Sequence, residues 1–381
     1  MIAAGPPERL ASLDAMRGFA IASMVLVNNP GDWGHLYAPL AHAKWNGWTF
    51  TDTVFPFFLF VSGVAMTLSM QARRDSGTGH AQLLARGARR AAVIFAVGLA
   101  LNFIPSFDPA TVRIPGVLQR IALCALIAAP IVIWGGWRSA LAAIGALFLL
   151  YSIVMLLMPV PGPDGVVAAG ALEPGRDFGA WVDRGLLGPH LWQATRTWDP
   201  EGIVSTLPAA ASLLFGVITG HVLVHRPAAT RGSVAMAIAG AALLLAGLAM
   251  DAGFMPINKN LWTPSYAVFM AGWSLVTLAV FSALLDEPPP RFRDRARTAV
   301  LPLTIFGMNA LFLFAFSGLV ARLLTAVTVE PGITLKARLY APLSSMPLAP
   351  ENASLLFAVL FENAMFAVAW LMWKKRWFVR A

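Results

Sequence analysis

The sequence has few charged residues and almost no cysteine. Only 12% of its 381 residues are Asp, Glu, Lys or Arg, against roughly 25% in a typical soluble protein. The surface of a folded chain with this composition would be mostly apolar, which excludes an ordinary water-soluble domain and favours lipid as its solvent. The single cysteine, Cys124, excludes a disulfide framework and a metal site built on cysteine. We predict no bound metal.

The basic excess of the chain does not indicate a nucleic-acid partner. The net charge is +9, but the Lys and Arg residues lie in short clusters between long apolar runs. Clusters at such positions are typical of the orientation signals of membrane proteins. We therefore predict the lipid bilayer as a partner and no nucleic acid.

Long apolar runs dominate the sequence. Hydrophobic residues make up 58% of the chain, and the mean hydropathy is +0.68. A helix needs about 20 mostly apolar residues to cross a membrane. We predict an all-α fold, in which a single polytopic domain over residues 1–381 has about ten transmembrane helices. The ten runs cover residues 10–29, 51–71, 88–105, 116–134, 138–158, 203–224, 233–250, 265–285, 300–322 and 354–373.

The loops between these runs set the orientation of the bundle. With the N-terminus inside, the cytoplasmic segments carry most of the Lys and Arg residues, among them Arg73, Arg74, Arg89 and Arg90. Since cytoplasmic loops of membrane proteins are enriched in these residues, we predict that both termini are cytoplasmic. The largest outer loop then covers about residues 159–202.

This topology brings several polar clusters to the outer end of the bundle. They are far apart in the sequence, yet each lies at the outer end of a predicted helix. We therefore expect one polar pocket at this face. The clusters are Asn28 with Asn29, His42 with Lys44, Thr51 with Asp52, Arg113 with Gln119 and Arg120, residues 197–202 with Asp199 and Glu201, and residues 256–266 with Asn258, Lys259 and Asn260.

Each polar feature also has a purely structural explanation. Trp, Lys and His at a membrane edge are common interfacial anchors, so His42 is either an anchor or a chemical group. Asp52 lies where a helix begins, which suits a capping role. Asp14 and Arg17 are three residues apart and share a helix face; we expect a structural ion pair, with direct catalysis as the alternative. Glu362, in the last run, is either a contact between helices or part of a polar path.

Several blocks of the sequence match a known family in the same order. They are RLASLDAMRGFAIASMVLVNN, HAKWNGWTFTDTVFPFFLFVSG, RIPGVLQRIALC, WDPEGIVSTLPA, PINKNLWTPSY and FGMNALFLF. In these blocks the chain resembles the heparan-α-glucosaminide N-acetyltransferase family, the lysosomal transmembrane acetyltransferases and their bacterial relatives. It is similar to the compact bacterial members, which lack the large lumenal N-terminal extension of the lysosomal enzyme. The resemblance therefore implies a multi-pass protein of the bacterial inner membrane.

The resemblance also implies an activity. Members of this family take acetyl-CoA, a co-substrate, from the cytoplasm and acetylate an amino sugar of the glucosamine type on the far side of the membrane. The active-site histidine of the family falls in the motif H-A-x-W-N-G, which places it at His42. The asparagine after the first helix of the family matches Asn28. The identity of the acceptor sugar is not carried over.

Acetyl transfer to an amine requires a base and donors for the developing oxyanion. Histidine titrates near neutral pH and serves as such a base; alternatively, His42 attacks the thioester and carries the acetyl group itself. Asp52 would orient the imidazole through its other nitrogen, and Asn28 and Asn260 would donate to the oxyanion. We expect Lys259 to hold an anion or a sugar hydroxyl. The full set expected to bind substrate is Asn258, Lys259, Asn260, Arg120, Asp199 and Glu201.

The donor raises a question of access, because the pocket faces outward while acetyl-CoA is cytoplasmic. We expect CoA to enter from the inside and its pantetheine arm to pass through the bundle toward His42. The candidates for contacts with its phosphates are Arg73, Arg74, Arg89 and Arg90.

Two other function classes compete with an enzyme. The first is a transporter of amino sugars, for which Glu362 is the best feature. Against it, no inverted repeat is apparent, and the polar clusters favour one face over the midplane. The second is a non-catalytic membrane partner in which His42 is only an interface residue. The oligomeric state is left open, with a homodimer as one candidate.

Overall fold

The computed structural model describes residues 10–225 and 232–379, and most of these residues are in helices. Two short antiparallel hairpins pair β1 (Val160–Pro161) with β2 (Val167–Ala168), and β3 (Thr328–Glu330) with β4 (Ile333–Thr334). The predicted all-α class is confirmed. The helices are α1 (Ala11–Val27), α2 (Phe50–Asp75), α3 (His80–Phe103), α4 (Val117–Trp134), α5 (Trp137–Leu157), α6 (Phe178–Leu187), α7 (Thr206–His225), α8 (Gly232–Gly253), α9 (Pro264–Leu285), α10 (Pro290–Ala299), α11 (Leu301–Met308), α12 (Ala310–Ala326), α13 (Leu335–Ser344) and α14 (Pro350–Lys374).

Helices occupy all ten ranges that the sequence predicted to span the membrane. Within the described residues, seven are long and apolar enough to cross a membrane, namely α2, α4, α5, α7, α8, α9 and α14, and α11 with α12 makes an eighth if this bent pair is one span. The remaining two ranges lie on α1 and α3, which do not meet these criteria. The 17 residues of α1 rise only about 25 Å, and the first half of α3 is basic. A multi-pass membrane protein is confirmed, with seven or eight spans by length and composition where the sequence predicted about ten.

The ninth predicted span is not one continuous helix, and here the prediction was wrong. The axes of α11 and α12 differ by 82°, because Asn309 between them leaves the helical conformation with φ −124° and ψ 36°. The buried Asn309 side chain bonds the C-terminal segment instead: Nδ2 donates to the Trp377 carbonyl at 3.0 Å, and Oδ1 accepts from the Val379 amide at 2.9 Å. These bonds supply polar partners at a break in an apolar helix.

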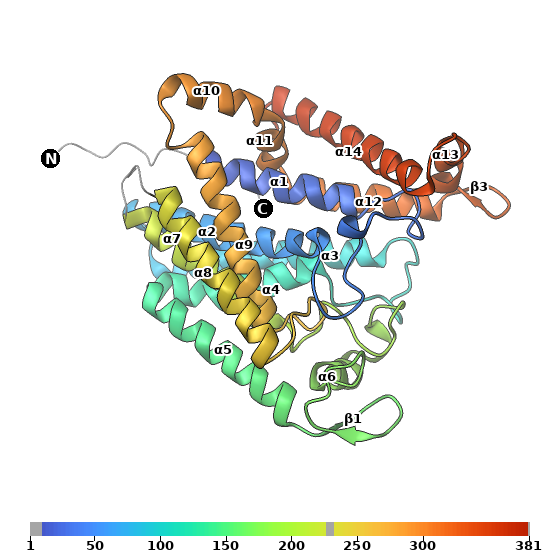
Figure 1. The fold of residues 1–381 in the computed structure, drawn as a ribbon, viewed down its shortest axis with the longest axis horizontal. Coiled ribbons are helices and arrows are strands. Elements are labelled where there is room, and N and C mark those ends of the chain that lie inside the picture. The colour runs from blue at the N-terminus through green and yellow to red at the C-terminus, as the bar shows by residue number, and fades with distance from the viewer. Residues whose placement is uncertain (1–9, 226–231, 380–381) are drawn as a thin grey trace.

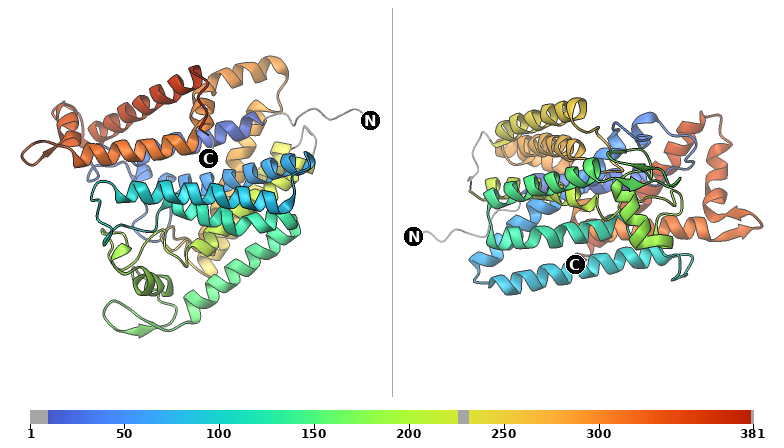
Figure 2. Two further views of the ribbon diagram at one scale, coloured as in Figure 1. Left: turned by 180° about the vertical axis from the view of Figure 1, so that it is seen from behind. Right: turned by 90° about the horizontal axis from the view of Figure 1, so that it is seen from below.

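The helices pack as a bundle around α2 (Figures 1 and 2). The most apolar stretch of α2 is 72% buried, whereas those of α8 and α5 are 22% and 28% buried, so these two lie at the periphery. Glycines allow close packing near the centre. A Cβ on Gly18 of α1 would lie 1.6 Å from the Leu303 carbonyl oxygen of α11, and one on Gly216 of α7 would lie 2.0 Å from that of Phe60 in α2. Small residues at such contacts are typical of membrane helix pairs.

The long loops gather at one end of the bundle, opposite the end where α1 begins (Figure 1). Three backbone hydrogen bonds tie them together: Gly47 N donates to Ile257 O at 2.8 Å, Ile114 N to His190 O at 3.0 Å, and Gly31 N to Ser354 O at 3.1 Å. The polar clusters that the sequence places at one membrane face therefore lie together. That this face is the outer one stays a prediction from the charge pattern.

Candidate active site

His42, Asp52 and Lys259 meet at this loop-rich end. His42 comes from the loop after α1, Asp52 from the first turn of α2, and Lys259 from the loop before α9. The Nδ1 atom of His42 lies 2.7 Å from Oδ1 of Asp52. The Asp52 side chain is 1% exposed, whereas that of His42 is 44% exposed. The pair thus has a buried carboxylate and an imidazole that a ligand can reach.

The Asp52 carboxylate is fixed by its own loop. Its Oδ2 accepts from the amides of Ala43 and Thr49, each at 3.0 Å, and from the Thr49 hydroxyl at 3.1 Å. Thr49 and Asp52 form a capping box at the start of α2. With Oδ2 saturated, Oδ1 remains for His42. When Nδ1–H donates to the carboxylate, the neutral imidazole carries its proton on Nδ1 and its free lone pair on Nε2.

Lys259 lies over the imidazole. Its Nζ is 3.2 Å from Nε2 and 3.0 Å from Nδ1 of His42, and 3.7 Å from Oδ1 of Asp52. If Nδ1–H points at Asp52, the ammonium donates to Nε2. Burial lowers the pKa of Lys259 below its ordinary value, although the negative charges of Asp52 and Glu201 oppose this shift.

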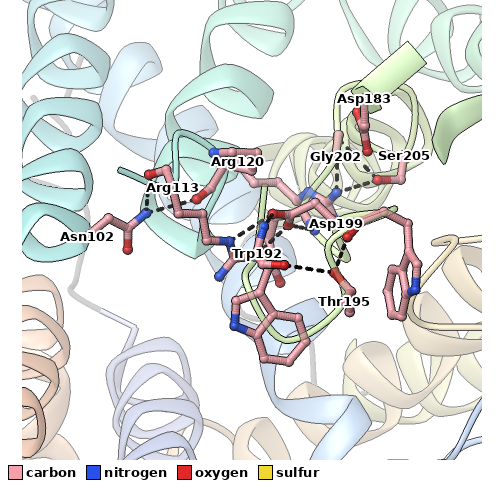
Figure 3. Close-up of polar contacts among 12 residues, drawn as sticks. Asn102, Arg113, Arg120, Asp183, Trp192, Thr195, Asp199, Gly202 and Ser205 are labelled. Carbon is pink, nitrogen blue, oxygen red and sulfur yellow. Dashed lines mark hydrogen bonds and ion pairs between the residues drawn. The ribbon is translucent and has the colours of Figure 1, made fainter. Parts of the chain in front are cut away.

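A second charged cluster surrounds Arg113 (Figure 3). Arg113, just before α4, binds Asp199 through Nε at 2.8 Å and Nη2 at 2.5 Å, and Nη2 also lies 2.5 Å from Oε2 of Glu201. The guanidinium covers the ring of Trp192, with its central carbon 5.4 Å from the ring centroid. Burial raises the pKa of Glu201, but the positive charges of Arg113, Arg120 and Lys259 outweigh this effect and lower it. The two clusters thus form one electrostatic unit.

Arg120 lies beneath this unit and is fully buried. Its Nη2 donates to the Gly202 carbonyl at 3.2 Å and the Ser205 hydroxyl at 2.5 Å, and its guanidinium lies 5.2 Å from the ring centroid of Trp262. Among the described residues its Nε and Nη1 have no hydrogen-bond partner. Arg120 therefore keeps two free donors close to the carboxylates.

The other predicted site residues fall into different places. Asn258 is buried and holds the loop before α9, donating to Asn46 Oδ1 at 3.0 Å and accepting from Leu261 N at 2.9 Å. Asn260 lines a small cavity with Asp183 and Asp199. Asn28 lines a different cavity, between α1, α12, α13 and α14. The structure therefore brings His42, Asp52 and Lys259 into contact and places Asn28 elsewhere.

The residues predicted near the cytoplasmic end make local contacts with one helix or with a helix end. Arg17 Nη1 lies 3.1 Å from Asp14 Oδ1, as their spacing suggested. Arg74 donates to the carbonyl oxygens of Val132 and Ile133 at the end of α4, where a cation complements the helix dipole. The role of Arg73, Arg74, Arg89 and Arg90 in binding CoA stays a prediction.

Asp183 of α6 makes the stability of the protein depend on pH. Burial raises its pKa to about 7, with help from the charges of Asp199 and Asp177. The native state therefore retains a proton that the unfolded state, with an ordinary carboxyl pKa, releases near pH 4. Hence the free energy of unfolding decreases as the pH rises from about 4 to about 7. We expect Asp183→Asn, which can still accept from the Ile203 amide, to stabilise the protein by about 1–3 kcal/mol at pH 8 and little at pH 4.

Thermal unfolding in detergent at both pH values measures this difference. Asp164→Asn is the control, since Asp164 is exposed and paired with Arg176 on the same loop. An equal shift in Tm at pH 4 and pH 8 for Asp183→Asn would contradict the assignment.

Sequence reasoning missed two parts of the site. The contacts of Arg113 with Asp199 and Glu201 span 86 and 88 residues, and no local spacing indicates them. Tyr266, whose hydroxyl donates to the Asp52 carbonyl at 2.5 Å, was likewise not assigned a role. In contrast, the Thr49–Asp52 capping box could have been recognised from the sequence alone.

Comparisons with known proteins agree on one family. The family model described as heparan-alpha-glucosaminide N-acetyltransferase, catalytic, matches residues 9–249. The chain is similar to heparan-alpha-glucosaminide N-acetyltransferase of Homo sapiens, with 30% identity over 338 residues, which is 74% of this chain and 49% of the relative. It is 28% identical to that of Mus musculus over 334 residues, 73% of this chain and 50% of the relative. The chain thus spans about half the length of the curated relatives it matches.

Proposed function

Because this chain belongs to the heparan-alpha-glucosaminide N-acetyltransferase family, we propose that it is a membrane acetyltransferase. It transfers the acetyl group of acetyl-CoA to the amine of an amino sugar of the glucosamine type. The acetyl-CoA comes from the cytoplasm, the acceptor binds at the outer face, and the membrane is the inner membrane of a bacterium. The similarity to two N-acetyltransferases supports the reaction class, and the distribution of charges along the loops supports the sidedness.

One observation carries the proposal: a reachable imidazole, His42, lies 2.7 Å from a carboxylate, Asp52, that is buried and held by three donors of its own loop. This arrangement fixes the ring and reserves Nε2 for a proton from outside. A carboxylate in this position also stabilises the imidazolium that forms when Nε2 takes the proton.

The reaction follows from these positions. The acceptor amine takes the place of Lys259 at Nε2 of His42, and its nitrogen attacks the thioester carbonyl. The C–N bond forms, the amine proton passes to Nε2, and the C–S bond then breaks. The CoA thiolate leaves and takes the proton from the imidazolium, so that the products are the acetamide and CoA thiol. We assign Asn260 as a candidate donor to the oxyanion, and the free donors of Arg120 as a further source of positive charge. Asn28 has no part in this step, because it lines a different cavity.

An acetyl-histidine intermediate is the alternative route. In that case Nε2 attacks the thioester first, and the acceptor attacks acetyl-His42 in a second step. We favour direct transfer because it requires only that Nε2 accept a proton, and the Asp52 carboxylate, 2.7 Å from Nδ1, stabilises the imidazolium that results. A burst of CoA thiol equal to the amount of enzyme, released without acceptor, would indicate the two-step route instead.

Release of CoA thiol by the purified protein tests the proposed function. We expect release from acetyl-CoA that depends on glucosamine or a related amino sugar. In sealed vesicles of known orientation, acetyl-CoA should act only from the side that carries the ends of α2 and α14. If no amino sugar in a panel supports release and CoA does not bind, the proposal is wrong. Accumulation of labelled amino sugar in vesicles without CoA would then indicate the transporter.

A further inference from the structure

The amine that contacts the His42 imidazole belongs to the protein itself. Nζ of Lys259 lies 3.2 Å from Nε2 and 3.0 Å from Nδ1 of the ring. Nδ1 is engaged by Asp52 at 2.7 Å, so Nε2 is the nitrogen left to accept from Nζ. The distance from Nζ to Nε2 is short enough for direct proton transfer to a general base. Lys259 therefore occupies the position that the proposed reaction assigns to the acceptor amine.

The loop that carries this lysine is tied to the loop that carries the imidazole. The Gly47 amide donates to the Ile257 carbonyl at 2.8 Å, and Nδ2 of Asn258 donates to Oδ1 of Asn46 at 3.0 Å. Both bonds lie within two residues of Lys259. Holding an amine and a base together turns their encounter into an intramolecular step, which replaces a high concentration of free amine. The tethered amine therefore competes with any acceptor that diffuses in.

A thioester can reach both groups from outside. The side chain of His42 is 44% exposed and that of Lys259 is 17% exposed. Nζ lies 3.7 Å from Oδ1 of Asp52, so it is closer to the ring than to this carboxylate. Burial lowers the pKa of Lys259, against the opposing charges of Asp52 and Glu201. The uncharged amine therefore forms more readily here than in a lysine exposed to water.

We propose that Lys259 is a self-acetylation site, to which the enzyme transfers the acetyl group of acetyl-CoA when no acceptor displaces the lysine. The inference rests on the proposed acetyltransferase function and adds a modification site to it. Lys259 first loses one proton to solvent as its ammonium becomes an amine. Nζ then attacks the thioester carbonyl: the C–N bond forms, a second proton passes to Nε2 of His42, and the C–S bond breaks. The CoA thiolate takes that proton, so that the products are acetyl-Lys259 and CoA thiol.

Acetylation of Lys259 blocks the site. The product is an amide, which has no positive charge and which an imidazole does not cleave readily. It stays beside Nε2 of His42, where the acceptor amine has to bind. The modification therefore limits the activity when acetyl-CoA is plentiful and the acceptor is scarce. A bound acceptor displaces Lys259 from the base and protects it.

Peptide mapping of the purified protein after incubation with acetyl-CoA alone tests the site. Lys44 is the matched control, because it is exposed and lies two residues after His42 in the same loop. We expect Lys259 to be acetylated about tenfold or more faster than Lys44. In His42→Ala the rate at Lys259 should fall about 10²-fold or more, while the rate at Lys44 stays the same. Equal rates at the two lysines, or an unchanged rate at Lys259 in His42→Ala, overturns the proposal.

The chemistry of the label separates self-acetylation from an acetyl-histidine, since either reaction releases CoA thiol without an acceptor. Neutral hydroxylamine removes an acetyl group from an imidazole but not from a lysine, and a label on His42 alone overturns the proposal.

The same preparation also separates this proposal from the proposed function. Acetylation of Lys259 should lower acceptor-dependent release of CoA thiol in proportion to the fraction modified, and full activity of the modified protein overturns the proposal. If release depends on an acceptor but Lys259 gains no acetyl group, the proposed function stands and self-acetylation is wrong. If Lys259 is acetylated but no amino sugar supports release, self-acetylation stands and the amino-sugar acceptor is wrong. If neither occurs, both are wrong.

Discussion

Replacing His42 by Ala is expected to lower kcat for acetyl transfer by about 10²–10⁴-fold, the range found for loss of a general base. The base must take the proton that the acceptor amine loses as the C–N bond forms. Lys259 is the nearest other base, but its ammonium must first lose a proton. The buried Asp52 carboxylate has Oδ2 saturated by Ala43 and Thr49. Acceptor-dependent release of CoA thiol by the purified variant measures the effect.

His35→Ala is the matched control for this substitution. His35 lies in the same loop, and its Nδ1 is also 2.7 Å from a carboxylate, that of Asp32. The difference is that the Asp32 side chain is 41% exposed, whereas that of Asp52 is 1% exposed. We expect kcat of His35→Ala to stay within about threefold of wild type, because an exposed pair neither fixes the ring nor excludes water. If His42→Ala also stayed within about tenfold, His42 would not be the base.

Most of the helices could be predicted from apolar runs. In lipid, such a run can satisfy the hydrogen bonds of its own backbone N–H and C=O groups only by forming a helix. The break at Asn309 could not be predicted. Hydropathy is continuous across residues 300–322, and the break depends on bonds to Trp377 and Val379, about 70 residues away in the sequence. The spacing of residues within a run contains no information about such a distant partner.

The candidate site was predictable only in part, for a related reason. The topology placed the polar clusters at one end, and the resemblance singled out His42. The partners of each charge, however, depend on how the loops fold over one another. Asp199 and Glu201 were assigned to the substrate, whereas in the structure both bind Arg113. Asn28 follows α1 directly and lines the cavity between α1, α12, α13 and α14, because the loop of residues 28–49 leaves α1 before it reaches His42.

Replacing Arg113 by Gln is expected to destabilise the protein by about 3–5 kcal/mol, the cost of removing one partner from a buried ion pair. The Asp199 side chain is fully buried and that of Glu201 is 10% exposed, so both would keep their charge with little access to water. Thermal or chemical unfolding in detergent measures the loss. Arg176→Gln is the control: Arg176 and Asp164 pair at the surface, each about two-fifths exposed, and such pairs contribute about 0–1 kcal/mol.

Comparing Arg113→Gln with a triple variant tests whether unpaired carboxylates cause the loss of stability. If the cost comes from two uncompensated carboxylates, then neutralising them in Arg113→Gln/Asp199→Asn/Glu201→Gln should recover part of the stability, so the triple variant would be more stable than Arg113→Gln. If Arg113 instead acts mainly by packing against Trp192, the triple variant would be no more stable than the single one, since the added substitutions would remove only further hydrogen bonds, such as that from Trp192 N to Asp199. The two explanations thus predict opposite orders of Tm for the same pair of proteins.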